Sequence, residues 1–226
     1  MSPPKGLPPE RIRATYLTFY SALIYDELEK LGYPNQALAT SIKPIAPEMK
    51  VAGPAFTMKA SSDPRLDESR FGLQVLDAIV PHAVVVYDTG HDSTVGHWGE
   101  IMSTCARMKG AQGTVIDGGT RDSAYIVRMG FPVFVRYRTP VEARGRFRLS
   151  EYQTPINMPG AISSNVTIDP GDYVFGDIDG VVVVPKALTL EVMRRAKARM
   201  RQENKVRAGL KAGSSAVEVF RKFGAF

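Results

Sequence analysis

The sequence is poor in the residues that cross-link a fold or bind zinc: its 226 residues include one cysteine and three histidines. The single cysteine, Cys105, excludes an internal disulfide and is consistent with a reducing compartment. So few thiols and imidazoles also argue against a structural zinc site of the usual kind. The fold therefore has to be stabilised by apolar packing, and the chain is long enough for one sizeable core.

Long hydrophobic segments are also missing. No apolar run approaches the roughly 18 residues of a membrane span. The first ten residues, MSPPKGLPPE, contain no apolar segment of the secretory type. We therefore expect a cytoplasmic protein with no membrane partner. The proline-rich residues 1–9 are expected to form a loose arm, and the chain shows no internal repeat.

Positive charge is in excess, with a net charge of +6 and an isoelectric point of about 9.4. This balance permits an anionic small molecule or a nucleic acid as partner. Much of the excess lies in Arg194–Lys211, where helical spacing spreads the charges over several faces. No aromatic residues interleave with these cations for base stacking. A solvated or subunit-bridging helix is therefore favoured over an RNA-binding face, and a nucleic-acid partner is not expected.

The middle of the chain alternates between strand and helix patterns. Strands are predicted at Ala83–Asp88, in GTVIDGG from Gly113 and in FPVFVRY from Phe131. Helices are predicted between them, over about 99–110 and 121–130. This alternation favours parallel β-α-β units with a buried sheet.

The flanking regions predict a different architecture. Upstream, Glu10–Leu31 is predicted to be helical, with a central break as an alternative, and SIKPIAPEMKVAGPAFTMKA is predicted to form short strands between its prolines. Downstream, residues 160–185 have short β runs separated by Asp-Pro-Gly and Asp-Gly turns, which predict antiparallel hairpins in a second sheet. A long helix over about 188–210 follows. The predicted organisation is one α/β domain over residues 1–226, with two β layers flanked by helices.

Two loops that follow predicted strands contain residues suited to bind an anion and a cation. The first, YDTGHDSTVGHWGEIM, leads into a helix whose first N–H groups can converge on an anion. These amides are those of Gly99, Glu100, Ile101 and Met102. In the second loop, DGGTRD, Arg121 offers a planar fork for a carboxylate or enolate, and Asp122 offers a hard oxygen ligand of the kind that Mg²⁺ takes. A helix cap beside a surface charge is the alternative explanation of this pair.

Three sequence blocks together resemble the RraA-like family: GEIMSTCARMKGAQGTVIDGGTRD, GFPVFVRYRTP and IDPGDYVFGDIDGVVVVP. The similarity extends from about Ala14 to the C-terminus. The family includes class II 4-hydroxy-4-methyl-2-oxoglutarate / 4-carboxy-4-hydroxy-2-oxoadipate aldolases and the regulator of ribonuclease activity A. The resemblance implies an α/β/β/α sandwich of the swivelling β/β/α type, with a central parallel or mixed sheet. It also implies homotrimers, or dimers of trimers (homohexamers), with sites at the subunit interfaces.

The resemblance further implies a chemistry for the two loops. Backbone amides of Gly99–Met102 would bind the pyruvate portion of a small anionic 2-oxo acid, Arg121 would bind its oxygens, and Asp122 would hold Mg²⁺, Mn²⁺ or another divalent cation. The expected reaction is retro-aldol cleavage of a 4-hydroxy-2-oxo acid to pyruvate, with oxaloacetate decarboxylation as a side activity. Glu100 is the candidate general base, acting directly or through water.

One departure from the family pattern weakens the aldolase prediction. Tyr125 stands where characterised aldolases carry an acid three residues after the metal-binding aspartate. This departure shifts weight toward another 2-oxo acid, or toward a non-catalytic regulator of a ribonuclease that acts through protein or RNA binding. Three other residues stay open: His91 and Asp92 either steer substrate or belong to a solvated loop, and Asp88 either lies near the metal or caps a turn.

Overall fold

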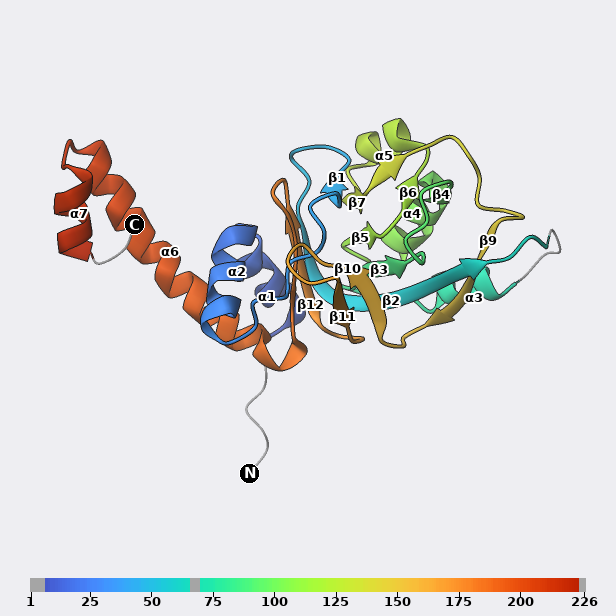
Figure 1. The fold of residues 1–226 in the computed structure, drawn as a ribbon, viewed down its shortest axis with the longest axis horizontal. Coiled ribbons are helices and arrows are strands. Elements are labelled where there is room, and N and C mark those ends of the chain that lie inside the picture. Colours follow the sequence, from blue (N-terminus) through green and yellow to red (C-terminus); the bar gives the residue numbers. More distant parts are fainter. Residues whose placement is uncertain (1–6, 66–69, 224–226) are drawn as a thin grey trace, which may run out of the picture.

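The computed structural model describes residues 7–65 and 70–223, and the fold is mixed α/β (Figure 1). The helices are α1 (Pro9–Tyr16), α2 (Ser21–Lys30), α3 (Phe71–Asp77), α4 (Glu100–Met108), α5 (Ser123–Met129), η1 (Lys186–Leu188), α6 (Thr189–Lys211) and α7 (Ala216–Phe223). The strands are β1 (Lys43–Pro44), β2 (Val51–Ser62), β3 (Val84–Asp88), β4 (Gly96–Trp98), β5 (Gly113–Ile116), β6 (Gly119–Thr120), β7 (Val133–Val135), β8 (Tyr137–Arg138), β9 (Phe147–Tyr152), β10 (Ile156–Pro159), β11 (Asn165–Ile168), β12 (Tyr173–Asp177) and β13 (Gly180–Val184). Most of the predicted arm over residues 1–9 lies outside the described residues.

The central sheet has the strand order β1-β7-β5-β3-β2-β12-β13, with β9 paired to β2. Strands β2, β3, β5 and β7 are parallel neighbours, joined through α3, α4 and α5. Every residue of β3, β5 and β7 is buried, as expected for parallel strands covered on both faces. The predicted parallel β-α-β core is therefore confirmed.

A second, smaller parallel sheet has the order β4-β6-β8. Each of its strands follows a strand of the central sheet in the chain: β4 follows β3, β6 follows β5 and β8 follows β7. GTVIDGG and FPVFVRY were each predicted to form a single strand, whereas each of these segments changes sheet partway along. The small sheet places a second set of strand ends beyond the first.

Two other strand predictions need correction. The segment predicted to form short strands between its prolines contains one short strand, β1, but its second half belongs to one long strand, β2, which continues through Pro54. Pro54 is tolerated because it lies at the last position paired with β12, directly before the register with β3 begins at Ala55. The hairpin β12–β13 also continues the central sheet through β2, so only β10 and β11 form a separate antiparallel pair.

The layers follow from which faces are apolar. On one face of the sheet, α3, α4 and α5 pack through Val75, Ala106 and Ile126. On the other face lies the hairpin β10–β11, which contributes Ile156 and Met158 to a second core cluster. Helices α1, α2 and α6 cover β12 and β13 in a third cluster. This arrangement confirms the predicted mixed α/β fold with a second β layer and flanking helices.

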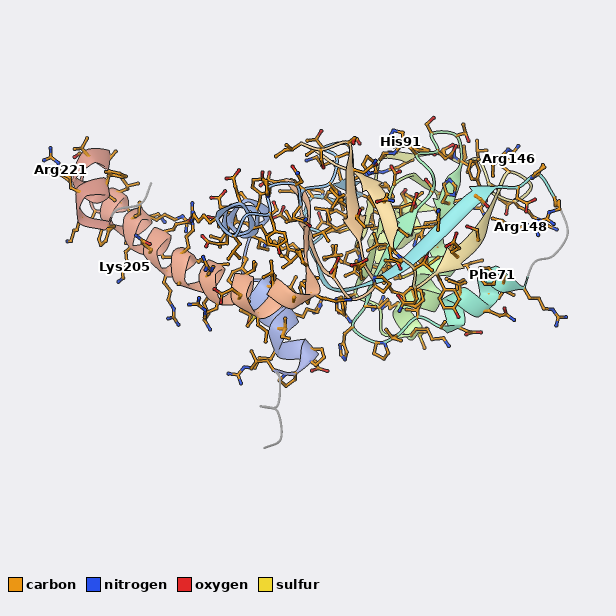
Figure 2. All side chains as sticks on the ribbon, turned by 60° about the horizontal axis from the view of Figure 1, so that its bottom comes forward. Phe71, His91, Arg146, Arg148, Lys205 and Arg221 are labelled. Atoms are coloured by element: carbon orange, nitrogen blue, oxygen red, sulfur yellow. The ribbon has the colours of Figure 1, made fainter. Side chains whose placement is uncertain are left out.

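The C-terminal helices form an arm. Figure 1 shows α6 leaving the body and α7 folded back against its far end. The first half of α6 packs on the body through the buried Val192 and Ala196, whereas Val206, further along, is buried near α7. The labelled Lys205 and Arg221 lie on this arm, away from the body (Figure 2). Within the described ranges, none of the helices combines the length and apolar character needed to cross a bilayer.

Candidate functional site

Both predicted loops lie at one edge of the small sheet. Strands β4 and β6 are parallel, and the register pairs Trp98 with Thr120. The residues that follow these strands, Gly99 and Arg121, are therefore neighbours. The backbone N–H of Arg121 donates a hydrogen bond of 2.9 Å to the carbonyl oxygen of Trp98. The prediction that folding brings the two loops together agrees with this geometry.

Asp122 is held against the first turn of α4. Its Oδ2 accepts a hydrogen bond of 3.2 Å from the backbone N–H of Glu100, and the Arg121 Nε lies 3.8 Å from the same oxygen. A β-carbon on Gly99 would lie 2.7 Å from this oxygen, which is shorter than any ordinary contact. Only glycine at position 99 leaves room for the carboxylate in this place. Asp122 itself has a φ of 59°, in the left-handed region that Asp and Asn tolerate better than most residues.

Buried hydrogen bonds fix the backbone on which these residues stand. The indole Nε1 of Trp98 donates to the Ser103 Oγ at 2.7 Å, and that hydroxyl donates to the Gly99 carbonyl at 2.9 Å. The Thr120 hydroxyl donates to the carbonyl of Trp98 at 2.9 Å. Trp98, Ser103 and Thr120 are all buried. The loops therefore start from rigid strand ends even though Arg121 and Asp122 are partly exposed.

A cavity of about 380 Å³ opens beside the Arg-Asp pair. Its lining residues come from the ends of β6 and β8: Thr120, Arg121, Asp122, Ser123, Arg138, Thr139 and Pro140. Gly99–Met102 are not among them; of these four residues, Gly99 approaches Arg121 and Asp122, and the backbone N–H of Glu100 bonds to Asp122. Arg138 and Thr139 were not singled out by the sequence analysis, because only the pairing of β8 with β6 brings them here.

Glu142 is a third residue of the site that was not predicted from the sequence. One of its carboxylate oxygens lies 3.5 Å from the Arg121 Nη2. Its side chain is half exposed, so the ion pair is weak and open to exchange with another anion. The position of Glu142 depends on the contact of its loop with β4, where the Gly96 N–H donates to the Val141 carbonyl at 2.8 Å. No local motif signals such a contact.

The side chains of Glu100 and Tyr125 make contacts that their motifs do not predict. The Glu100 carboxylate accepts a hydrogen bond of 2.7 Å from the Thr104 hydroxyl, one turn along α4. Thus the backbone of Glu100, and not its carboxylate, contacts Asp122. The Tyr125 side chain is 63% exposed, and the Arg128 guanidinium lies 4.4 Å from the centre of its ring. Ile101, in the same first turn of α4, is 74% exposed.

The donor set limits the kind of metal site that the loops can form. Across residues 7–65 and 70–223, no group of three or more His, Cys, Asp or Glu side chains could hold a metal ion. These described residues of one chain therefore do not by themselves provide the three or four side-chain ligands of a usual structural zinc site. A single partly exposed carboxylate, Asp122, beside an open cavity suits Mg²⁺, which often takes one or two carboxylates and fills its other positions with water and substrate oxygens.

A buried ion pair lies beneath the two loops, where β5 and β7 of the central sheet end. The Arg136 Nε is 2.9 Å from the Asp117 Oδ1, and the Asp117 side chain is only 2% exposed. Burial raises the pKa of the Asp117 carboxyl, and Arg136 and His91 oppose that shift. Arg136 also donates through Nη2 to the carbonyl oxygen of His91 at 3.1 Å. His91 itself lies at the edge of the body (Figure 2).

Asp92 and His97 form a second buried pair in the same region. The His97 Nε2 is 3.0 Å from the Asp92 Oδ2, and the Tyr137 hydroxyl donates to the same oxygen at 3.1 Å. Asp92 is therefore a structural residue of an ordered loop, which corrects the expectation of either a solvated loop or a substrate-steering residue. Asp88 caps a turn, since its Oδ1 accepts the Gly90 N–H at 2.8 Å.

A sequence model of the family described as RraA-like (Aldolase/RraA) matches residues 21–183. A protein of Halalkalibacterium halodurans that bears the name "Putative 4-hydroxy-4-methyl-2-oxoglutarate aldolase" is 32% identical over 182 residues, or 80% of each chain. Protein DlpA of Legionella pneumophila is 29% identical over 196 residues, which are 86% of this chain and 31% of the Legionella protein. This chain thus spans about a third of that relative's length.

A solved structure agrees with these sequence matches. The crystal structure of Streptomyces coelicolor RraAS2 is described as that of an unusual member of the RNase ES inhibitor RraA protein family. It superimposes with a TM-score of 0.75 at 26% identity, covering 90% of this chain and 99% of that chain. Both loops of the candidate site lie within the residues that the family model matches.

Proposed function

Because the chain belongs to the RraA-like family, we propose that it is a metal-dependent lyase of the aldolase type that acts on a small 2-oxo acid. The observation that carries this proposal is the packing of the Arg121-Asp122 pair against Gly99 and Glu100 at the edge of a cavity. A fixed cation, a carboxylate and a helix N-terminus meet there. The aldolase name of the Halalkalibacterium relative favours the same reaction class.

Substrate binding would use the two loops together. The Arg121 guanidinium presents parallel N–H donors that match a carboxylate or an enolate oxygen. The first-turn N–H groups of Ile101 and Met102 have no partner within α4, because its first intrahelical bond is made by Ser103 to Gly99. These amides and the helix dipole favour an anion beside Asp122. Binding would displace Glu142 from Arg121, since both compete for one guanidinium.

Asp122 is the residue that would hold Mg²⁺ or a similar divalent cation. When bound, the cation would act as a Lewis acid on the keto and carboxylate oxygens of the substrate. The Asp122 carboxylate lies against Gly99, and the hydrogen bond from the Glu100 N–H holds it in this place. Electrostatic attraction to Arg121 holds the side chain at the mouth of the cavity.

The proposed reaction breaks the C3–C4 bond of a 4-hydroxy-2-oxo acid. A base removes the proton of the C4 hydroxyl, C4 becomes a carbonyl, and the electron pair of the broken bond moves into the C2 carbonyl as an enolate. Protonation at C3 then gives pyruvate. Arg121 stabilises the oxygen that gains charge, and Glu100 is the proposed base after its carboxylate leaves Thr104. Loss of CO₂ from oxaloacetate gives the same enolate, so decarboxylation is the proposed side activity.

Subunit association is part of the proposal. Helices α4 and α5, which carry the site, expose the apolar side chains of Ile101 (74%), Met108 (82%) and Tyr125 (63%). An exposed apolar surface of this kind next to a site is typical of an interface. We propose that copies of this chain associate through this face as a trimer or a dimer of trimers, which would place the cavity next to a neighbouring subunit.

A direct assay tests the enzymatic proposal. Pyruvate release would be measured from 4-hydroxy-4-methyl-2-oxoglutarate and from oxaloacetate, with Mg²⁺ and with EDTA, for the wild type and for Asp122→Asn. Asparagine suits the positive φ of position 122, so the variant removes the charge without straining the backbone. We expect Mg²⁺-dependent turnover that Asp122→Asn abolishes. Absence of turnover, or turnover that ignores both EDTA and the substitution, contradicts the proposal.

A second candidate function is regulation of a ribonuclease through protein or RNA binding. The observation in its favour is the α6–α7 arm, on which cations outnumber anions and which extends from the body. The relationship to Streptomyces coelicolor RraAS2 points the same way. A blank RNA shift and a blank ribonuclease pull-down at low salt, where such contacts are strongest, would count against this function.

A further inference from the structure

We propose that Arg138 is a specificity-determining residue of the proposed site, where it binds the distal carboxylate of a dicarboxylic 2-oxo acid. The inference rests on the proposed function, because it assigns a further residue of the same cavity. It adds a residue that belongs to neither of the two loop motifs.

The small sheet brings Arg138 to the same cavity as the Arg-Asp pair. Strands β6 and β8 are parallel neighbours, and Arg138 pairs with Thr120, the residue that precedes Arg121. Both guanidinium groups line the same cavity of about 380 Å³. This volume lies at the lower end of the range of small-molecule sites, which is roughly 300–1,000 Å³. Ser123 and Thr139, whose side chains carry hydroxyls, line the same cavity.

Arg121 and Arg138 differ in the carboxylates that lie beside their guanidinium groups. Arg121 has Asp122 at 3.8 Å and Glu142 at 3.5 Å. No carboxylate among the residues that the structure describes pairs with Arg138, whose one side-chain hydrogen bond runs from Nη2 to the carbonyl oxygen of Ile45 at 2.5 Å. That bond anchors the guanidinium without neutralising it. Its remaining N–H donors are available to a ligand.

These contacts distinguish the two guanidinium groups of one cavity. The 2-oxo carboxylate of the ligand belongs with Arg121, Asp122 and the first turn of α4. An anion elsewhere on the ligand would complete the coordination of Arg138, and a carboxylate matches its planar fork best. A ligand with a neutral tail would leave the Arg138 charge unpaired. A hydrogen bond to a charged group typically contributes enough for about tenfold or more in affinity.

Binding of two non-cleavable ligands tests the inference without any requirement for turnover. We would titrate the wild type, in the presence of Mg²⁺, with 2-oxoglutarate and with 2-oxobutyrate by calorimetry. The first carries a distal carboxylate, and the second ends in a methyl group. We expect the wild type to prefer 2-oxoglutarate by about tenfold or more, and Arg138→Gln to lose most of that preference. Arg138→Lys keeps the charge without the fork and should retain an intermediate preference.

The control is Arg201→Gln, which removes an exposed arginine from α6, far from the cavity along the chain, and should bind both ligands as the wild type does. A wild type that binds both ligands equally, or an Arg138→Gln variant that keeps the full preference, would overturn the inference. The outcome is separable from that of the proposed function. A diacid preference without pyruvate release would refute the lyase and leave Arg138 as a binding residue. Pyruvate release without the preference would support the lyase and refute the role of Arg138.

Discussion

Asp122 occupies the space that a side chain on Gly99 would need: its Oδ2 lies 2.7 Å from the position of a β-carbon there. The two residues come from different loops, 23 positions apart in the sequence. Their close approach links the residue that precedes α4 to the proposed metal ligand. It makes the smallest possible substitution, the addition of one methyl group, a sharp test of the site.

We predict that Gly99→Ala lowers kcat/KM for pyruvate release by about 10²-fold, because displacement of a site group by about 1 Å can cost this much. The backbone of Gly99 is extended, with a φ of −148°, so alanine can adopt it and the loss would come from the displaced carboxylate. Steady-state kinetics and the stabilisation of the protein by Mg²⁺ in thermal unfolding would both be measured.

The matched control is Gly72→Ala in α3, where a β-carbon would meet only the Leu149 Cδ1 at 3.7 Å. Alanine in a helix is more favourable than glycine. We expect this variant to keep full activity and an unchanged or higher melting temperature. Equal activity of Gly99→Ala and the wild type would show that the position of Asp122 is irrelevant to the reaction.

The central sheet was the most predictable part of the fold. The run Val84–Asp88 is apolar until its last residue, and all five residues are buried in a parallel strand. Gly130, predicted as a helix stop, follows α5 with a φ of 68°. The break between α1 and α2, held open as an alternative, is present at residues 17–20. In each case a local signal coincides with the tertiary arrangement.

The small sheet could not be predicted in the same way. Strands of two or three residues, such as Gly119–Thr120 and Tyr137–Arg138, are too short to show a period. The pairing of these strands decides which side chains face the cavity, so no local pattern in the sequence places Arg138 there. Arg121 and Asp122 could be singled out because both lie in one short motif. Glu142 lies outside any motif, and only the contact of its loop with β4 brings it to Arg121.

The buried pair of Asp117 and Arg136 gives a stability prediction. Arg136→Met leaves the buried Asp117 carboxylate with only the partly exposed His91 beside it and should lower the free energy of unfolding by about 3–5 kcal/mol. Asp117→Asn in the Arg136→Met background removes that stranded charge and should recover part of the loss. Urea unfolding of the two single variants and the double variant measures the coupling. Strictly additive losses would show that the two side chains act independently.

The buried His97 gives a pH prediction. Burial lowers the pKa of its imidazole below the usual 6.5, although Asp92 opposes that shift. The unfolded chain therefore binds a proton near pH 6.5 that the folded protein binds only at lower pH. The free energy of unfolding should fall as the pH drops from about 6.5 toward the folded-state pKa, by at most about 1.4 kcal/mol per pH unit. Above about pH 7.5, His97 should cause no such loss.

Urea titrations at pH 5.5 and 7.5 would measure this effect. His97→Gln has no group that titrates in this range, so the difference in unfolding free energy between the two pH values should be smaller than in the wild type. The aromatic rings of Tyr87 and Phe147, which contact the imidazole, do not ionise in this range. An identical pH dependence in the variant would place the acid sensitivity elsewhere, with the carboxylates as the next source to examine.

The exposed face of α4 and α5 gives a prediction about assembly. Met108 is 82% exposed and lies seven positions after Ile101, so both side chains project from one side of α4. Met108→Glu would bury a charge in the proposed interface and should shift the assembly toward a single chain of 24.8 kDa. Light scattering after gel filtration measures the mass, and pyruvate release should fall with it if a neighbour completes the cavity.

The control for this prediction is Ile162→Glu, which places the same charge at a side chain that is 65% exposed in the turn between β10 and β11, on the opposite side of the central sheet from α4. It should leave both mass and activity unchanged. Dissociation without loss of activity would show that one chain forms a complete site, and the cavity between Arg121 and Arg138 would then be sufficient for catalysis. A wild type that is already a single chain would refute the proposed association outright.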